Sequence, residues 1–253
     1  MEAECLRAVD VGLPAVAFTE HVDFADWSTG DTRPAGLVVG HRPRVMPLDV
    51  DGYFAEIARC RDLFPGLRIL SGIEAGEPHL FSESVAAVLA AGRFDRVLGS
   101  LHSIAVGGTL TGVSARLFAA LDPHELMHRY FTDMVGLIEQ SGVFTVLAHC
   151  DFPRRYWPTE RAGAYREADF EEQYRTVFRA LAGSGRALEI NTKSPLASVD
   201  LMRWWWQEGG DAVSFGSDAH RPELVGNKFE LAVDIVEAAG FRPGRDTYDF
   251  WRR

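Results

Sequence analysis

The sequence predicts an α/β fold of parallel strands joined by helices, and three observations support this. Short apolar runs alternate with segments of helical periodicity along the whole chain. Polar residues that can bind metals repeatedly follow these runs, as over residues 212–220, where a buried run leads into Asp218 and His220. No linker, repeat or low-complexity tract divides the 253 residues, so we expect one domain over residues 1–253.

The composition limits the kinds of molecule that this protein is expected to bind. The formal net charge of −10 disfavours nucleic acid and anionic membrane surfaces, although a small phosphorylated substrate remains compatible with it. The cysteines Cys5, Cys60 and Cys150 are scattered and odd in number, which indicates a reducing compartment and no disulfide framework. The sequence shows no signal peptide and no apolar run long enough to span a bilayer, so we expect a cytoplasmic protein.

The N-terminal part is predicted to hold a helix, a strand and a long connection. A helix over residues 2–12 leads into a short buried strand over residues 14–18. Recurring Gly and Pro predict an irregular connection over residues 24–49, and a connection of this length is usually functional. Five of its side chains could contact a substrate: Trp27, Arg33, His41, Arg42 and Arg44.

Two strands and two helices are predicted next. Residues 50–64 show helical spacing of apolar side chains, which a Pro-Gly pair ends. The apolar run over residues 67–73 predicts a strand. A helix over residues 82–92, with Ser82 as its N-cap, separates this strand from another over residues 95–100.

The clearest helix start of the chain lies at Asp122. Asp122 is the predicted N-cap, Pro123 takes the first helical position, and Glu125 completes a capping-box pattern. This helix is expected to end near Gly142, and the apolar residues 143–148 then predict a strand.

The remaining pattern continues the alternation of strand and helix. Residues 170–181 show a helical apolar face, and residues 187–190 are predicted to be a strand. A short helix holds three tryptophans at positions 204–206, which cannot all face one way, so we expect one or two of them in the core. A strand from Ala212 and an amphipathic helix over residues 223–239 follow.

Metal-binding residue types fall at the ends of these predicted strands. Ligands bind at the carboxyl ends of the strands in folds of this kind, so side chains at those ends are expected to meet. The residues at these positions are His21, Glu74, His102, His149, Asn191, Asp218 and His220.

Four imidazoles and two carboxylates at one rim need a cation or buried partners to be stable there. Imidazoles and carboxylates together suit zinc, manganese or iron, and the mixture does not choose among them. Six ligands exceed one tetrahedral site, so we expect two or three divalent ions. Clustered metals favour hydrolysis, because they lower the pKa of bound water and stabilise charge on a phosphoryl or acyl oxygen.

Cationic side chains close to the same strand ends could bind a phosphate. Arg154 and Arg155 follow His149 by a few residues, and Lys193 and Arg221 each follow a candidate residue closely. Asn191 is a further candidate substrate contact, and Asp151 and His220 are the candidates for protonating the leaving group.

A competing metal motif occurs at residues 124–128, which match the H-E-x-x-H pattern of zinc proteases. The motif lies in the first turn of a predicted helix, where Glu125 already has a capping role. No third ligand follows on that helix, so we disfavour a protease.

Five short motifs together resemble the PHP (polymerase and histidinol phosphatase) family, and its histidinol-phosphatase-like branch most closely. They are Thr19-Glu20-His21, Gly72-Ile73-Glu74, Gly99-Ser100-Leu101-His102-Ser103, Ala148-His149-Cys150-Asp151 and Gly216-Ser217-Asp218-Ala219-His220. The resemblance extends from about residue 3 to about residue 240.

The resemblance implies a distorted (β/α)7 barrel, similar to a TIM barrel, with a trinuclear metal site at its C-terminal rim. It also implies phosphoester hydrolysis by a metal-bound hydroxide. Carried over residue by residue, the metal ligands are His21, Glu74, His102, His149, Asp218 and His220, and Arg154 or Arg155 holds the phosphate.

One part of the family pattern has no counterpart here. The family opens with a strand that bears an H-x-H pair and a further histidine, whereas this sequence begins at the helix that should follow. The true start could lie upstream, the protein could be a degenerate member with fewer metals, or another segment or chain could replace the strand. We favour the first explanation, because the other family motifs are intact.

The expected function is therefore metal-dependent hydrolysis of a small phosphate monoester such as histidinol phosphate. A non-catalytic or impaired metal-binding barrel is the alternative, which the absent first motif favours. A phosphodiesterase or nuclease of the PHP type is a third, which the acidic charge disfavours.

Overall fold

The computed structural model describes residues 1–27, 38–39, 47–193 and 195–253. The strands of its main sheet are β1 Ala15–Val22, β3 Arg68–Gly76, β4 Arg96–Ser100, β7 Val146–Leu147, β8 Ala187–Asn191, β9 Ala212–Gly216 and β10 Trp251–Arg252. They pair in the order β1-β3-β4-β7-β8-β9-β10, and only β10 runs antiparallel to its neighbour.

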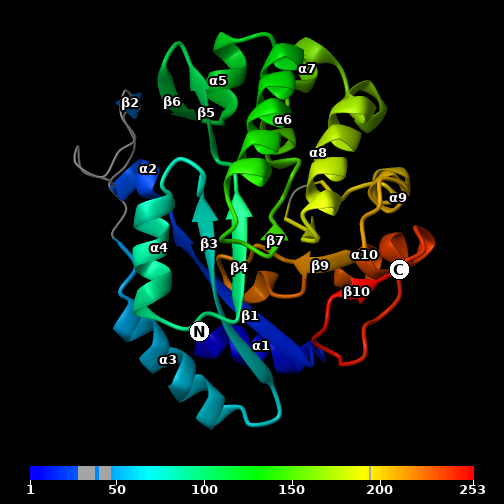
Figure 1. Cartoon of the computed structure of the whole chain (residues 1–253). Helices are drawn as coiled ribbons and strands as arrows, with labels where there is room; N and C mark the ends of the chain where they lie inside the picture. The colour runs from blue at the N-terminus through cyan, green and yellow to red at the C-terminus, as the bar shows by residue number, and fades with distance from the viewer. Residues whose placement is uncertain (28–37, 40–46, 194) are drawn as a thin grey trace.

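Helices connect the parallel strands and pack on one another in succession. The longer ones are α1 Glu2–Asp10, α3 Val50–Leu63, α4 Ser82–Ala91, α6 Pro123–Gln140, α8 Glu171–Gly183, α9 Val199–Gln207 and α10 Phe229–Ala238. The short ones are α2 Phe24–Trp27, α5 Ala115–Ala120, α7 Thr159–Ala162, η2 Phe152–Tyr156, η3 Glu167–Phe170 and η4 Pro222–Leu224. Helix α8 packs between α6 and α9, and α9 packs on α10 (Figure 1).

The largest apolar core lies between these helices and the sheet. Tyr130 and Phe131 of α6 meet Phe178 of α8 there, and all three are buried. Trp204 and Trp205 of α9 join this core, while Trp206 is 39% exposed. The expectation that one or two of the three tryptophans are core residues is therefore confirmed.

The sheet is strongly curled. Five strand spacings separate β1 from β9, which would place them roughly 24 Å apart in a flat sheet. Yet the ring of His21, on β1, lies 5.6 Å from the ring of His220, which follows β9. The prediction of a distorted α/β barrel is thus confirmed. Within the described ranges, six parallel strands curl into an open barrel, and β1 pairs only with β3.

A second, smaller sheet was not predicted. Strands β5 Ser103–Val106 and β6 Thr109–Gly112 form a hairpin, and β2 Val38–Val39 pairs with β6. Gly107 and Gly108 connect the hairpin with φ of 58° and 79°, which a two-residue turn of this kind requires. Strand β5 begins directly after His102, so the hairpin extends the segment that carries this candidate ligand.

Several predicted element ends need correction. Ser82 is the first residue of α4 and not its N-cap; Phe81 holds that position with its side chain buried in the core, which sets where the helix begins. The strand predicted over residues 143–148 is shortened to β7 Val146–Leu147, with Thr145 and Ala148 adding backbone hydrogen bonds to Val97 and Gly99 of β4. The helix predicted from residue 223 begins at Phe229, because η4 comes first.

The start of α6 is confirmed in part. Asp122 Oδ1 accepts the backbone N–H groups of His124 and Glu125, and Pro123 is the first helical residue. The predicted capping box is wrong, since the Glu125 carboxylate pairs with Arg129 one turn along the helix.

Only part of the predicted connection over residues 24–49 can be compared. Trp27 ends the short helix α2, whereas Arg33, His41, Arg42 and Arg44 lie outside the described residues. Among the helices that the structure describes, none is both long and apolar enough to cross a membrane.

Candidate metal centre

The six predicted metal ligands lie at the C-terminal ends of the parallel strands. His21 comes from β1, Glu74 from β3, His102 follows β4, His149 follows β7, and Asp218 and His220 follow β9. All but Glu74 line one cavity of about 600 Å³, and Glu74 contacts two residues of that lining, His102 and His149. The structure therefore brings together the six side chains that the register of strand ends in the sequence had singled out.

Glu74 is the centre of the first cluster. Its Oε1 lies 2.7 Å from Nε2 of His149 and 3.1 Å from Nε2 of His102. Burial by itself would raise the pKa of this carboxyl, but the two imidazoles hold it well below its usual range. One carboxylate oxygen and two imidazole nitrogens thus converge on one point.

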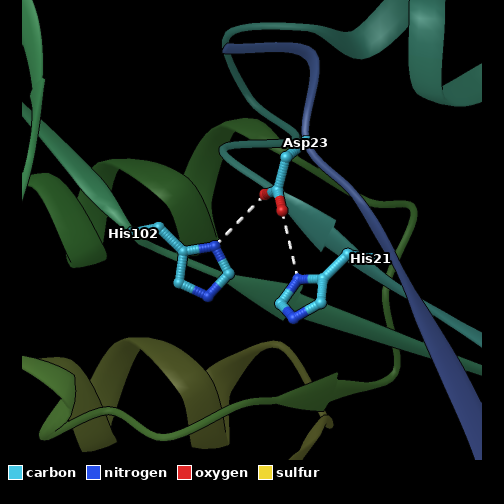
Figure 2. Close-up of side chains that lie close together, drawn as sticks. All are labelled: His21, Asp23 and His102. Carbon is cyan, nitrogen blue, oxygen red and sulfur yellow. Dashed lines mark hydrogen bonds and ion pairs between the residues drawn. The ribbon is translucent and has the colours of Figure 1, made fainter. Parts of the chain in front are cut away.

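Asp23, which the sequence analysis did not single out, joins two of these histidines. Its Oδ2 lies 3.1 Å from Nδ1 of His21, and its Oδ1 lies 3.2 Å from Nδ1 of His102, as Figure 2 shows. Burial opposes ionisation, yet the neighbouring His102 and His21 hold the pKa of Asp23 far below its usual value. Its position two residues after His21, at the same strand end, was the available signal.

These residues fit a divalent cation. Two groups could each hold an ion: one is His21, Asp23 and His102, and the other is Glu74, His102 and His149. Glu74 and Asp23 are buried, and among the described residues only histidines lie within ion-pair distance of them. Buried carboxylates without Lys or Arg partners need another source of positive charge, which a metal ion supplies.

The opposite side of the cavity is cationic. Asp218 pairs with Arg155 Nη2 at 2.6 Å and with Lys193 Nζ at 2.9 Å. His220 Nδ1 lies 3.0 Å from the same Lys193 Nζ. Asn191 Oδ1 accepts from Arg155 Nη2 at 3.3 Å and from the backbone N–H of Lys193 at 3.0 Å. The structure therefore brings these five predicted site residues together.

Glu189 is a second residue that the sequence analysis missed. It lies on β8 with its carboxylate buried, and Oε2 accepts the backbone N–H of His149 at 2.8 Å and Nδ2 of Asn191 at 3.1 Å. Burial raises the pKa of this carboxyl. Glu189 thus connects the histidine side of the cavity with the cationic side.

Two predicted site residues lie elsewhere. Arg154 is not among the described residues that line the cavity; its Nη1 pairs with buried Glu167 at 2.7 Å and donates to the Leu196 carbonyl at 3.2 Å. Asp151 is also absent from that lining and lies 3.7 Å from Arg154. Burial raises the pKa of Asp151.

The competing H-E-x-x-H motif makes no metal site in the described part of the chain. His124 packs its ring against Trp157 and Phe170, with centroids 5.3 and 5.5 Å away, and His128 also contacts Phe170. Neither histidine belongs to a group that could hold an ion among the residues described. The packing of His124 and His128 against aromatic rings agrees with the sequence-based argument against a protease.

From this histidine–carboxylate cluster we expect the stability of the protein to change with pH in opposite directions with and without bound metal. In the metal-free protein the pKa of His102 is raised well above its ordinary 6.5: burial lowers it, but Asp23 and Glu74 raise it more. The stability that this shift adds is fully present below about pH 6.5 and is lost as pH rises through the folded-state pKa. Metal needs deprotonated imidazoles, so the metal-bound protein should instead gain stability over this interval.

Urea unfolding at several values between about pH 6 and pH 9, with chelator or with excess zinc, measures both slopes. We expect the free energy of unfolding to fall with pH in chelator and to rise with pH in zinc. Parallel slopes in the two solutions would contradict a metal site at these histidines.

The curled parallel sheet, with histidines and carboxylates gathered at its C-terminal rim, defines a metal-binding barrel of the (β/α) class. The family model described as "PHP domain" matches residues 1–193. The chain belongs to the PHP domain family, as the sequence motifs predicted.

Similar proteins are known in bacteria. A probable histidinol-phosphatase of Deinococcus radiodurans is 28% identical over 244 residues, covering 93% of this chain and 85% of that protein. The histidinol-phosphatase of Lactococcus lactis is 26% identical over 247 residues, covering 93% and 83%. A crystal structure of histidinol phosphate phosphatase from Lactococcus lactis, in complex with zinc, L-histidinol and phosphate, superposes with a TM-score of 0.78. At 23% identity, with 95% and 87% of the two chains covered, that superposition shows the shared fold.

Proposed function

We propose that this protein is a metal-dependent phosphatase that hydrolyses a small phosphate monoester, with histidinol phosphate as its substrate. The observation that carries the proposal is the two-sided cavity, in which a histidine–carboxylate cluster faces Arg155 and Lys193. The family and the names of the two bacterial relatives support phosphatase chemistry and this substrate.

Two or three divalent ions, of zinc, manganese or iron, would be held by His21, Glu74, His102, His149, Asp218 and His220. The zinc in the Lactococcus lactis structure supports zinc as the first ion to test. When bound, such ions supply Lewis-acid stabilisation of charge on the phosphoryl group and lower the pKa of a water molecule. His102 has a carboxylate at each ring nitrogen, so its orientation is set before an ion arrives.

Arg155 and Lys193 are the residues that we propose to bind the phosphate. Both line the cavity, and both now pair with the same carboxylate, Asp218. If Asp218 binds a metal ion, its negative charge is shared, and the two cations become available to phosphate oxygens. Asn191 holds Arg155 and the backbone of Lys193 in place for this role.

The leaving alkoxide needs a proton, and His220, when it is not bound to a metal ion, is better placed than Asp151 to hold it. His220 lines the cavity and its side chain is 54% exposed there, whereas Asp151 lies outside the lining and is buried. Asp151 is instead proposed to have a structural role, as a buried partner of Arg154 outside the cavity. The cytoplasm is the proposed compartment, which the three buried cysteines without disulfides support.

The decisive experiment combines elemental analysis with phosphate release from histidinol phosphate and from a generic aryl phosphate. We expect bound divalent metal, faster release from histidinol phosphate, loss of release in chelator and recovery on adding zinc or manganese. Full metal content without release from either ester would favour the non-catalytic barrel. Release only from an oligonucleotide would favour a nuclease.

A further inference from the structure

A buried carboxylate beside the metal cluster has no role in the scheme above. Glu77 follows β3 by one residue, and its side chain is fully buried. Its Oε1 accepts the backbone N–H of His102 at 2.7 Å and that of Ser103 at 2.6 Å. Its own N–H donates to the Ser100 carbonyl at 2.9 Å. Glu77 therefore holds both ends of the turn between β4 and β5.

The backbone of Glu77 is strained, and two residues of the candidate metal centre, His149 and Asp218, also have positive φ. Its φ is +45°, in the left-handed region that disfavours residues with a Cβ. The described non-glycine residues with positive φ are Glu77, His149, Asp218 and Lys228. Two of the other three are candidate metal ligands, and strained residues cluster at functional sites because the surroundings must hold them. Glycine would relieve the strain, so the presence of Glu indicates that its carboxylate is needed.

His102 is the ligand whose position matters most. It belongs to both groups that could hold an ion, with Nδ1 at Asp23 and Nε2 at Glu74. A backbone shift at His102 would therefore disturb both groups at once. Its carbonyl accepts from Val113 N–H at 2.8 Å. Glu77 completes this support by holding the N–H side of the turn.

We infer that Glu77 is a positioning residue of the metal centre, which sets the place of His102 through the backbone of the β4–β5 turn. The inference rests on the proposed metal-dependent function. Hydrogen bonds from N–H groups to a carboxylate are shorter and stronger than those to neutral acceptors, and one oxygen here serves two consecutive N–H groups. The turn therefore requires a hydrogen-bond acceptor at the end of a side chain as long as that of glutamate.

Zinc affinity, measured by competition with a chromophoric chelator, tests this on three variants of the full chain. Glu77→Asn tolerates the left-handed backbone but is one methylene too short, so we expect zinc affinity to fall about 10- to 100-fold. Glu77→Gln keeps an oxygen at the same reach and should recover most of that loss. Tyr130→Phe removes a hydrogen bond of the same turn that does not involve His102, the one from Tyr130 Oη to the Leu101 carbonyl at 3.1 Å. It should lower the unfolding midpoint and leave zinc affinity unchanged.

The inference is overturned if Glu77→Asn binds zinc as tightly as the wild type, or if Tyr130→Phe loses as much affinity as Glu77→Asn. A wild-type chain that binds neither zinc, manganese nor iron would overturn the proposed function as well, so the two failures are distinguishable. If Glu77→Asn does not fold, the inference is tested instead by amide hydrogen exchange at His102 and Ser103 in the wild-type protein. Slow exchange at His102 and Ser103 supports the inference, and fast exchange at both overturns it.

Discussion

Glu74→Gln is expected to remove bound metal and to lower kcat/KM for phosphate release by on the order of 10³-fold or more. The Glu74 carboxylate contacts Nε2 of both His102 and His149, and its charge is buried. An amide is neutral, so it cannot supply the negative charge that faces two imidazoles here and that a bound cation would need. Without this carboxylate, the cluster loses the side chain that contacts both His102 and His149.

Elemental analysis and phosphate release on the same preparation measure both effects, with circular dichroism to confirm folding. Glu125→Gln is the matched control, because Glu125 is exposed on α6 and pairs only with Arg129 in the described contacts. It should retain full metal content and activity. Wild-type metal content together with an unchanged rate in Glu74→Gln would exclude Glu74 as a ligand.

Two neighbouring arginines should respond in opposite ways to the same substitution. Arg155→Met is expected to lower kcat/KM about 10²- to 10³-fold, because it removes a charged donor that faces the cavity. Arg154→Met should leave kcat/KM nearly unchanged but reduce the free energy of unfolding by about 3 kcal/mol, since buried Glu167 loses its cation.

Steady-state kinetics and urea unfolding on both variants separate these outcomes. Metal content should stay at the wild-type level in Arg155→Met, which distinguishes lost phosphate binding from a damaged metal centre. If Arg154→Met loses activity as strongly as Arg155→Met while its stability is unchanged, the assignment of the two roles would have to be reversed.

Local pattern was enough to predict most of the fold. Apolar runs and helical spacing located the parallel strands and the helices between them, because burial on a sheet and on one helix face imposes different periods. Element ends were less predictable. Residues 143–148 are all compatible with a strand, yet the backbone hydrogen bonds to β4 and β8 involve only residues 145–148, because these neighbouring strands decide where the ladder forms.

The candidate ligands were predictable because the same place, the carboxyl end of a parallel strand, recurs in each strand–helix unit of the chain. His21, His102 and His149 each lie at or just beyond the end of a parallel strand, and parallel strands end at one rim. Arg154 and Arg155 show where this reasoning stops. They are adjacent in the sequence, and only the direction of each side chain in η2 separates the one that faces the cavity from the one that meets Glu167.

The amino-acid sequence by itself determined the α/β class, the PHP family and the set of histidines and carboxylates at the strand ends, since these depend on periodicity and on residue types at fixed places. Only the tertiary structure decided which buried carboxylates hold which histidines. Asp23, Glu77 and Glu189 contact residues 79, 25 and 40 positions away, respectively. Contacts between distant residues depend on how the curled sheet packs as a whole, and no local pattern encodes that packing.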